Sequence, residues 1–358
     1  MKRLLQPLFL LLLAVTLVTF GCSSSPTPLT SPDTASMESP TQQDQTMAFG
    51  QIKAVQQKHT PGLLGISGIV GTATGKANGK YPVLVILAEH EGIHDIPDTL
   101  DGADVEVVVT GPIYALGNME PQGNTYNAIA SSPSSQYPRP VPIGISTGSE
   151  VVCTSGTIAC RVKRGGSVYA LSNNHVLAGT NSAQLGSRVL QPGRYDSSCS
   201  VISSNVMGNL YDFVPIDFSG GYNLVDAAIA LTSTSDLGKS TPPDGYGIPC
   251  SETLHPQVDM GVVKYGRATG FTWRAEITSI TATVKVAYPE GTATFNDQIM
   301  VRSPGAFAQE GDSGSLLVTE KEKRPVGLIF AASSNGTLVM ANRIDHVLDA
   351  LDVTIDGK

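Results

Sequence analysis

The sequence has no excess of basic residues and no paired-cysteine zinc pattern. Its 358 residues include 23 Lys and Arg against 31 Asp and Glu, so the formal net charge is -8 and the pI is about 5.2. Without a basic surface to neutralise phosphates, nucleic acid is not an expected partner. The spacing C-x₂-C, which structural zinc sites use, is absent. With 41% apolar residues, the chain is long enough to bury a sizeable core and to form two domains.

An export signal is predicted at the N-terminus. Residues 1–21 combine two basic residues, a leucine-rich apolar run and a small residue before Cys22. The stretch resembles a bacterial lipobox, in which Cys22 carries the lipid and begins the mature chain, although Thr19 stands where leucine is usual. Plain secretion is the alternative. A retained transmembrane helix fits less well, because the run is short and no stop-transfer charges follow it. We therefore expect the protein in the bacterial cell envelope, outside the cytoplasm.

Four segments follow the signal. Residues 22–45 are rich in Ser, Thr and Pro and predict a disordered tether. Residues 46–115 predict a small α/β module. Residues 116–141 contain many Pro, Ser, Gly and Asn residues and predict a linker. In residues 142–358, short apolar runs alternate with turn residues, which is typical of an all-β barrel or sandwich; only the stretch "RIDHVLDALDV" near the end has helical spacing.

Within the small module, the spacing of apolar residues predicts a helix over residues 46–59 that ends before Pro61. The stretches "LLGISGIVGTATG" and "YPVLVILAE" are then separated by the turn-forming "KANGK", and an alternating strand "ADVEVVVTG" follows. The module therefore contains one helix and three main strands.

Beyond Cys22 the exported chain has an even number of cysteines, which predicts two disulfides. The four are Cys153, Cys160, Cys199 and Cys250. Three connectivities are possible. We favour Cys153 with Cys160 and Cys199 with Cys250, because the first pair could close a short hairpin.

The stretch "HEGIH", from His90 to His94, matches a zinc-binding pattern in which two histidines one helical turn apart hold the metal and Glu91 acts as general base. That chemistry requires a helix. Here His90 directly follows a predicted strand, Gly92 lies inside the motif and Pro97 ends any helix soon afterwards. No later histidine stands at the spacing of a third ligand. We therefore expect a polar loop between two strands, with no metal and no cofactor.

Three stretches of the β-rich part carry the residue types of a nucleophilic site: "LSNNHVLA" with His175, "NLVDAAIAL" with Asp226 and "GDSGS" with Ser313. A serine hydroxyl needs a base within hydrogen-bond reach and a carboxylate that orients the base. Structural alternatives exist for each residue, namely a buried histidine, an ordinary turn serine and an aspartate that opens a strand. Asp212 and Asp217, in "YDFVPIDF", rival Asp226 for the carboxylate role.

This order of motifs resembles the trypsin-like serine peptidases, in a bacterial branch related to narrow-leaf-type and glutamyl-endopeptidase-like members. The supporting stretches are "GTIACRV", "VVKYGRATG" and "VGLIFAAS", and the resemblance covers about residues 138–355. It implies a mainly β, chymotrypsin-like fold of two six-stranded barrels, here preceded by the small α/β module, with the site in the cleft between the barrels. Protein or peptide substrates are implied as partners.

The resemblance also implies a role for each matching residue. Ser313 would be the nucleophile, His175 the general base and acid, and Asp226 the group that holds the imidazole tautomer. The backbone N–H groups of Gly311 and Ser313 would form the oxyanion hole.

Asp312, next to the nucleophile, would in this family be buried against a cationic partner. In digestive members that partner is a new amino terminus. No convincing activation site precedes the barrel here, because Arg139 is followed by Pro140, so an internal arginine such as Arg139 or Arg267 is expected to serve instead.

The residues expected at the substrate pocket favour small or medium apolar side chains. Phe307, six residues before Ser313, would lie at the base of the pocket, and this does not support an acidic floor for basic residues. Ala331 and Ala332 would stand near the wall, where glycine is frequent, and narrow it. No histidine follows Ser313 in that region, which argues against glutamate specificity.

Two alternatives of other classes remain open. An HtrA-like chaperone-protease is suggested by the similarity of "SNNHV" to "TNNHV", although no peptide-binding domain is expected after the last helix. A catalytically inactive binding protein with the trypsin fold is the other. The oligomeric state is not predicted by the sequence.

Overall fold

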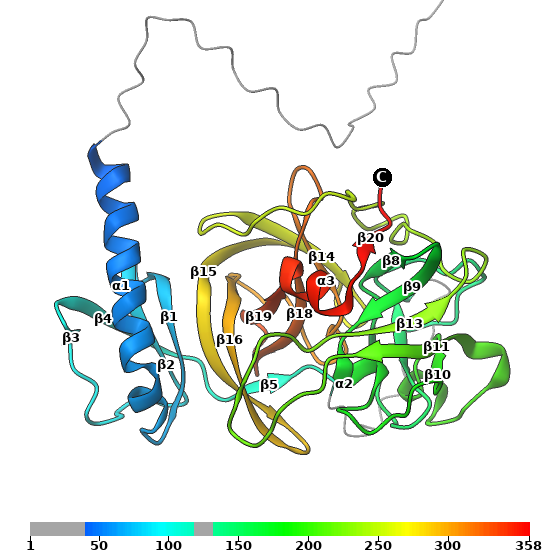
Figure 1. The fold of residues 1–358 in the computed structure, drawn as a ribbon, viewed down its shortest axis with the longest axis horizontal. Helices are drawn as coiled ribbons and strands as arrows, with labels where there is room; N and C mark the ends of the chain where they lie inside the picture. The colour runs from blue at the N-terminus through cyan, green and yellow to red at the C-terminus, as the bar shows by residue number, and fades with distance from the viewer. Residues whose placement is uncertain (1–39, 118–131) are drawn as a thin grey trace, which may run out of the picture.

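The computed structural model describes residues 40–117 and 132–358 (Figure 1). The chain is mainly β, and its strands form two curled sheets of 12 and eight strands. These two sheets match a chymotrypsin-like double β-barrel with a small N-terminal module, so the predicted fold class is confirmed. In Figure 1 the module lies at one end, the long strands β15 and β16 lie in the middle, and β8, β9, β10, β11 and β13 lie at the other end.

The eight-stranded sheet belongs to the first barrel. Its order is β20-β8-β9-β13-β11-β10-β6-β7. The tight turn between β8 and β9 uses Gly165 and Gly166 at φ +55° and +85°, a backbone region that glycine adopts without strain. The bounds are β6 Ser146–Ser149, β7 Gly156–Thr157, β8 Cys160–Arg164, β9 Ser167–Ser172, β10 Arg188–Leu190, β11 Val206–Phe213, β13 Ala228–Thr232 and β20 Thr354–Ile355.

The 12-stranded sheet contains the second barrel and the strands of the module. Its order is β12-β16-β19-β18-β17-β14-β15-β1-β2-β4-β3, and β5 pairs with both β15 and β18. The barrel strands are β12 Tyr222–Asn223, β14 Gly261–Gly266, β15 Gly270–Tyr288, β16 Gly291–Arg302, β17 Leu316–Thr319, β18 Pro325–Ser333 and β19 Leu338–Arg343. The strands before them are β1 Ile69–Ala77, β2 Lys80–Ala88, β3 Thr99–Leu100, β4 Ala103–Val109 and β5 Ile113–Ala115.

The module is joined to the second barrel by direct strand pairing. Strand β1 pairs antiparallel with β15, so the module and the barrel share one sheet. Helix α1 is fixed to both strands by the buried Gln56, whose Nε2 donates to the carbonyl oxygens of Thr281 at 2.7 Å and Thr72 at 3.2 Å. Separating the helix from these strands would leave the buried Gln56 amide without its acceptors, and an unsatisfied buried donor costs free energy.

Helix α1 spans Pro40–Leu64 and is longer than the predicted helix over residues 46–59. It begins inside the predicted tether, and the prediction that it ends before Pro61 is wrong. Pro61 lies in the last turn, where its missing N–H removes only one helical hydrogen bond. Leu63, two residues later, is buried with Ile69 and Ile86 and thereby holds this last turn on the sheet. The export signal and residues 22–39 lie outside the described residues.

The remaining helices are short. They are α2 Asn174–Leu177, α3 Ile344–Leu351, and the 3₁₀ turns Tyr195–Ser197 and Ser203–Asn205. In α3 the residues Ile344, Val347 and Leu351 are buried, as the helical spacing of this stretch predicted. Among the described helices, none has the length and apolar character needed to cross a bilayer.

The predicted disulfide pairing is wrong. Cys153 is joined to Cys199, with their Cα atoms 5.1 Å apart, and Cys160 is a free, buried thiol. Cys160 begins β8 and is buried in the apolar core of the first barrel. Arg194 brings the two disulfide-bonded loops together, because its guanidinium donates to the carbonyl oxygens of Cys199 at 3.1 Å and Glu150 at 2.9 Å. Burial raises the pKa of the Cys160 thiol.

Candidate active site

His175 and Asp226 are brought together by two neighbouring strands of the first barrel. His175 lies in the single turn of α2 directly after β9, and Asp226 lies just before β13, which pairs with β9. His175 Nδ1 is 2.5 Å from Asp226 Oδ2, and the His175 backbone N–H donates to Asp226 Oδ1 at 3.2 Å. Both side chains are buried. A carboxylate in this position fixes the proton on Nδ1 and leaves Nε2 as the basic nitrogen.

The Asp226 backbone is held from both sides. Its N–H donates to Asn342 Oδ1 at 2.9 Å, and Asn342 Nδ2 in turn donates to Gln298 Oε1 at 2.7 Å. Asn173 Nδ2 donates to the Asp226 carbonyl oxygen at 2.6 Å. These amides come from β19, β16 and the turn before α2, so elements of both barrels position the carboxylate.

The Asp226 carboxylate also accepts a hydrogen bond from Tyr288, at the end of β15. The Tyr288 hydroxyl lies 2.9 Å from Oδ2, the oxygen that faces the His175 ring. Burial and the negative charge of Asp226 raise the pKa of Tyr288 well above its usual value. Tyr288 therefore remains a neutral donor to the carboxylate.

The two rival carboxylates lie elsewhere. Asp212 is on β11, 3.8 Å from Arg164 Nη2, and Asp217 accepts hydrogen bonds from the backbone N–H and the hydroxyl of Ser219. Neither contacts His175, so Asp226 is the carboxylate that meets the imidazole.

Ser313 lies in a tight turn of the second barrel, before β17. The turn requires glycine on both sides, because Gly311 and Gly314 have φ values of +97° and +88°. The first barrel holds this turn through β7: the Thr157 N–H donates to the Ser313 carbonyl oxygen at 2.7 Å, and its hydroxyl donates to the Gly311 carbonyl oxygen at 2.8 Å. The turn therefore lies at the junction of the two barrels.

The Ser313 hydroxyl is not bonded to the imidazole in this conformation. Its Oγ donates to the Phe330 carbonyl oxygen at 3.0 Å. His175 Nε2 is buried and has no hydrogen-bond partner among the described residues. A buried nitrogen without a hydrogen-bond partner costs free energy. We therefore expect another group to bind, or to move, to a position where it can bond to His175 Nε2.

Asp312 is buried against Lys264 and not against either predicted arginine. Lys264 Nζ lies 2.9 Å from Asp312 Oδ2, and both side chains are fully buried. The carboxylate also accepts from the backbone N–H groups of Ala268 and Gln309, each at 2.9 Å. Burial lowers the pKa of Lys264, while the Asp312 charge opposes this effect.

The expected role of Arg139 or Arg267 is therefore wrong. Arg139 pairs with Asp236 at 2.5 Å, and Arg267 pairs with Asp196. Lysine fits at position 264 because β14 passes directly beside the Ser313 turn. The neighbouring Gly266 leaves room for the pair, since a Cβ atom there would lie 2.3 Å from Asp312 Oδ1 and 2.9 Å from Lys264 Nζ.

A segment of the N-terminal part lies along the site. Strand β5 pairs antiparallel with β18, with Ala115 opposite Ala331. The next residue, Leu116, donates its N–H to the Phe330 carbonyl oxygen at 3.1 Å and accepts the Gly311 N–H on its own carbonyl oxygen at 2.5 Å. Gly117 then lies against the imidazole, because a Cβ atom there would be 2.5 Å from His175 Cδ2 and 2.9 Å from Nε2.

Two of the three predicted pocket residues, Phe307 and Ala332, belong to the same buried apolar cluster as Leu116. Leu116 is buried in one apolar cluster with Phe307, Ala308 and Ala332. Ala331 is buried in a different cluster, because alternate residues of a strand face opposite sides. Phe307 is buried, with 1% of its surface exposed, and it supplies an aromatic ring and no acidic group to this cluster.

The "HEGIH" stretch forms a loop between β2 and β3, with Gly92 at φ +75° and Asp95 at φ +72°. His90 Nδ1 lies 2.9 Å from the Glu91 carbonyl oxygen, and His90 and Glu91 are exposed. The helix that this zinc motif requires is not formed. Across residues 40–117 and 132–358, no group of three His, Cys, Asp or Glu side chains could hold a metal ion.

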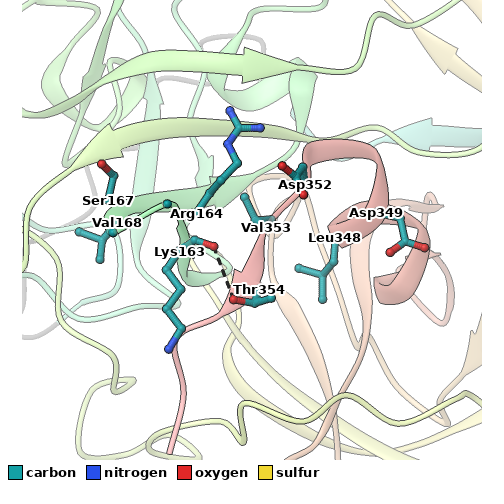
Figure 2. A pocket seen from close by; sticks show the side chains of 11 residues that line it. Lys163, Arg164, Ser167, Val168, Leu348, Asp349, Asp352, Val353 and Thr354 are labelled. Carbon is teal, nitrogen blue, oxygen red and sulfur yellow. Dashed lines mark hydrogen bonds between the residues drawn. The ribbon is translucent and has the colours of Figure 1, made fainter.

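A separate hollow of about 730 Å³ lies between the β8–β9 hairpin and the end of α3 (Figure 2). Figure 2 shows Lys163 and Arg164 on the hairpin side, with Asp349 and Asp352 on the side of α3. None of its lining residues belongs to the site around His175.

Comparisons with known proteins give matches among solved structures. No protein-family model and no curated protein matches the sequence. Solved structures similar to this chain include a glutamic acid-specific serine protease, at 18% identity and TM-score 0.43, with 60% of this chain and 100% of that chain covered. Thermobifida fusca Protease A has 16% identity and TM-score 0.44, with 61% and 100% covered. Cellulomonas bogoriensis chymotrypsin has 16% identity and TM-score 0.41, with 61% and 99% covered.

Sequence reasoning missed three features of the site. Tyr288 lies in an ordinary strand sequence, and nothing in its neighbourhood signals a contact with Asp226. Lys264 had a signal, because a lysine inside the apolar run "GVVKYG" must find a buried partner. Leu116 and Gly117 were assigned to a linker, and only the three-dimensional path of β5 brings them to Gly311 and His175.

Proposed function

We propose that this protein is a serine endopeptidase that hydrolyses peptide bonds through an acyl-enzyme. The observation that carries the proposal is the Leu116 carbonyl oxygen, which accepts the Gly311 N–H beside the buried His175–Asp226 pair. A carbonyl held on a backbone donor and next to an imidazole is in the position of a scissile bond. The Gly311 and Ser313 N–H groups form the proposed oxyanion hole.

In the proposed mechanism, Ser313 Oγ leaves the Phe330 carbonyl and donates to His175 Nε2. The imidazole takes the proton as the oxygen attacks the substrate carbonyl, and it later donates that proton to the leaving amine. Asp226 stabilises the imidazolium and holds its orientation. The buried pair of Lys264 and Asp312 keeps the Ser313 turn in place, so the oxyanion donors need no reorganisation during the reaction.

A catalytically inactive binding protein is the second candidate. It is favoured by one observation, the hydrogen bond from Ser313 Oγ to the Phe330 carbonyl in place of His175. An HtrA-like chaperone-protease is a third reading, on sequence similarity alone. The relation to narrow-leaf-type and glutamyl-endopeptidase-like members likewise belongs to the proposal.

We also propose that the enzyme acts outside the cytoplasm, where the Cys153–Cys199 disulfide persists. Attachment to a membrane through a lipid on Cys22 is the favoured location, and secretion is the alternative. Substitution Cys22→Ala should release the protein from membranes, as measured by fractionation. An unmodified wild-type protein found wholly in the culture medium would contradict the anchor.

The experiment that tests the activity is hydrolysis of a soluble peptide with leucine before the scissile bond. Ser313→Ala should lower kcat by roughly 10⁴-fold, because only binding and the oxyanion donors remain. Equal turnover by the wild-type chain and Ser313→Ala would contradict the assignment, and absence of turnover by both would favour the binding protein.

A further inference from the structure

Residues Ile113 to Gly117 are arranged as a bound substrate would be in the proposed site. An extended segment that adds to a sheet edge gains main-chain hydrogen bonds, while its alternate side chains enter pockets. Strand β5 follows this pattern on β18, with Ser333 opposite Ile113 and Ala331 opposite Ala115.

Three contacts then fix the end of this segment. The Leu116 N–H donates to the Phe330 carbonyl at 3.1 Å, which continues the pairing with β18. The Leu116 carbonyl oxygen accepts the Gly311 N–H at 2.5 Å, which is the position of a developing oxyanion. Gly117 lies so close to the imidazole that a Cβ atom there would be 2.9 Å from Nε2.

We infer that the Leu116–Gly117 peptide bond is the first substrate of the site and is cleaved within the same chain. This inference rests on the proposed function. It places a cleavage site in a segment that has no basic activation site. It also gives the N-terminal module the role of delivering that segment, since β1–β15 pairing and β5–β18 pairing hold it beside Gly311 and His175.

The reaction balances without any reagent except water. Ser313 Oγ attacks the Leu116 carbonyl carbon, and its proton moves to His175 Nε2. The bond between the Leu116 carbonyl carbon and the Gly117 nitrogen breaks, and His175 donates its proton to that nitrogen. Water then hydrolyses the ester between Leu116 and Ser313 with His175 again as the base. The products are a Leu116 carboxylate and a chain that begins with the Gly117 amine.

The same contacts define the class of substrate that the site takes from other proteins. The residue before the scissile bond should be apolar and of leucine size, because Leu116 is buried in the same apolar cluster as Phe307, Ala308 and Ala332. A charged side chain there would be buried without a partner. The residue after the bond should be glycine or another small residue, because the His175 ring occupies the space that a larger side chain would need.

The test follows cleavage of the full chain by gel electrophoresis and N-terminal sequencing of the fragments. The wild-type chain should give a C-terminal fragment that begins Gly117-Asn118-Met119, and Ser313→Ala should stay intact. Leu116→Asp should slow this cleavage by about 100-fold or more, because a carboxylate enters an apolar pocket. The rate constant should not change over roughly a 100-fold dilution, since an intramolecular step is independent of concentration.

Val109→Asp is the matched control, because Val109 lies on the preceding strand β4 and its side chain is 48% exposed. It should be cleaved at the wild-type rate. Gly117→Val is a second variant, since its branched side chain would collide with the His175 ring, and it should also be cleaved slowly. Circular dichroism and thermal unfolding establish that each variant is folded, and one folded variant of the two is enough for the test.

Hydrolysis of an added leucyl peptide separates the two claims. If the peptide is cleaved in a Ser313-dependent way while the Leu116–Gly117 bond stays intact or the chain is cut at another bond, this inference is overturned and the proposed function stands. If neither the chain nor the peptide is cleaved, both this inference and the proposed function are overturned. Cleavage at Gly117 that slows in proportion to dilution would overturn the claim that it occurs within the chain.

Discussion

The Tyr288 hydroxyl donates to Asp226 Oδ2 at 2.9 Å, and this is the oxygen that lies 2.5 Å from His175 Nδ1. Tyr288 comes from the end of the long strand β15, whose other pairings join the second barrel to the N-terminal module. The carboxylate that orients the imidazole is therefore positioned by an element of the other barrel.

Removal of the Tyr288 hydroxyl should change how stability depends on alkaline pH. The folded-state pKa of Tyr288 is raised well above 10.0 by burial and by the Asp226 charge. Above pH 10 the unfolded chain loses this proton first, while the folded chain retains it, so the free energy of unfolding falls as pH rises. Below pH 10 both states hold the proton and this contribution is fully present.

In the Tyr288→Phe chain, the free energy of unfolding should therefore fall less steeply between about pH 10 and pH 11. The difference in slope should be up to roughly 1.4 kcal/mol per pH unit. Urea unfolding in a Ser313→Ala background, which keeps the chain intact, measures the slope. Tyr222→Phe is the control, because Tyr222 is 51% exposed and should leave the slope unchanged. Identical slopes for Ser313→Ala chains with and without Tyr288→Phe would contradict the assignment of a buried, neutral donor.

His175 and Ser313 should behave as one catalytic unit. Each single substitution to alanine should lower kcat on a leucyl peptide by about 10⁴-fold, and the double variant should lose little more, because neither residue acts without the other. The full cycle of four chains provides the measurement. A double variant in which the two losses multiply would show that the residues act independently.

Loss of the Lys264 charge should destabilise the chain strongly. Lys264→Met leaves the fully buried Asp312 carboxylate without its cation, at a cost of about 3 kcal/mol. Adding Asp312→Asn should recover part of this loss, since it removes the unpaired charge. Urea unfolding provides the free energies. Lys58→Met is the control, because the Lys58–Asp101 pair is exposed and its loss should have no measurable effect. A Lys264→Met chain as stable as the control would contradict the role of the pair.

The cysteines should be distinguishable by peptide mapping without reduction. A linked peptide pair should contain Cys153 and Cys199, while the Cys160 thiol should react with an alkylating agent only after unfolding, because it is buried. Replacing both Cys153 and Cys199 by serine should lower the free energy of unfolding by about 2–4 kcal/mol. Recovery of a peptide linking Cys153 to Cys160 would contradict this pairing.

The mainly β character was predictable because period-two apolar runs and turn residues are local signals, whereas the chymotrypsin-like double barrel was implied by the resemblance of motifs. The module strands agree with this, and the Asn78–Gly79 turn between β1 and β2 has the positive φ angles that its sequence predicts. The disulfide pairing was not predictable, since it depends on which loops approach each other across the first barrel. A short sequence separation between Cys153 and Cys160 says nothing about the direction in which the two side chains point.

The site likewise contains residues with a local sequence signal and residues that only the three-dimensional path of the chain brings together. His175, Asp226 and Ser313 were predicted from the order of their motifs; the structure brings His175 within hydrogen-bond distance of Asp226, while Ser313 Oγ donates to the Phe330 carbonyl oxygen. The sequence signals that Lys264 is buried with a partner, but it does not show that this partner is Asp312, because only the path of β14 brings the two side chains together. Leu116 has no motif at all, and its importance depends on the hydrogen bond from Gly311.

The most direct test of the proposed serine peptidase is to locate the residue that reacts with a serine-directed fluorophosphonate. The processed wild-type protein should be labelled at Ser313 and lose its peptidase activity, while a metal chelator should leave activity unchanged. Glu91→Gln should be labelled and active, because Glu91 is exposed on the loop between β2 and β3. Activity that survives labelling of Ser313, or that a chelator and Glu91→Gln abolish while Ser313→Ala is tolerated, would contradict the account and restore the metal-dependent reading of "HEGIH".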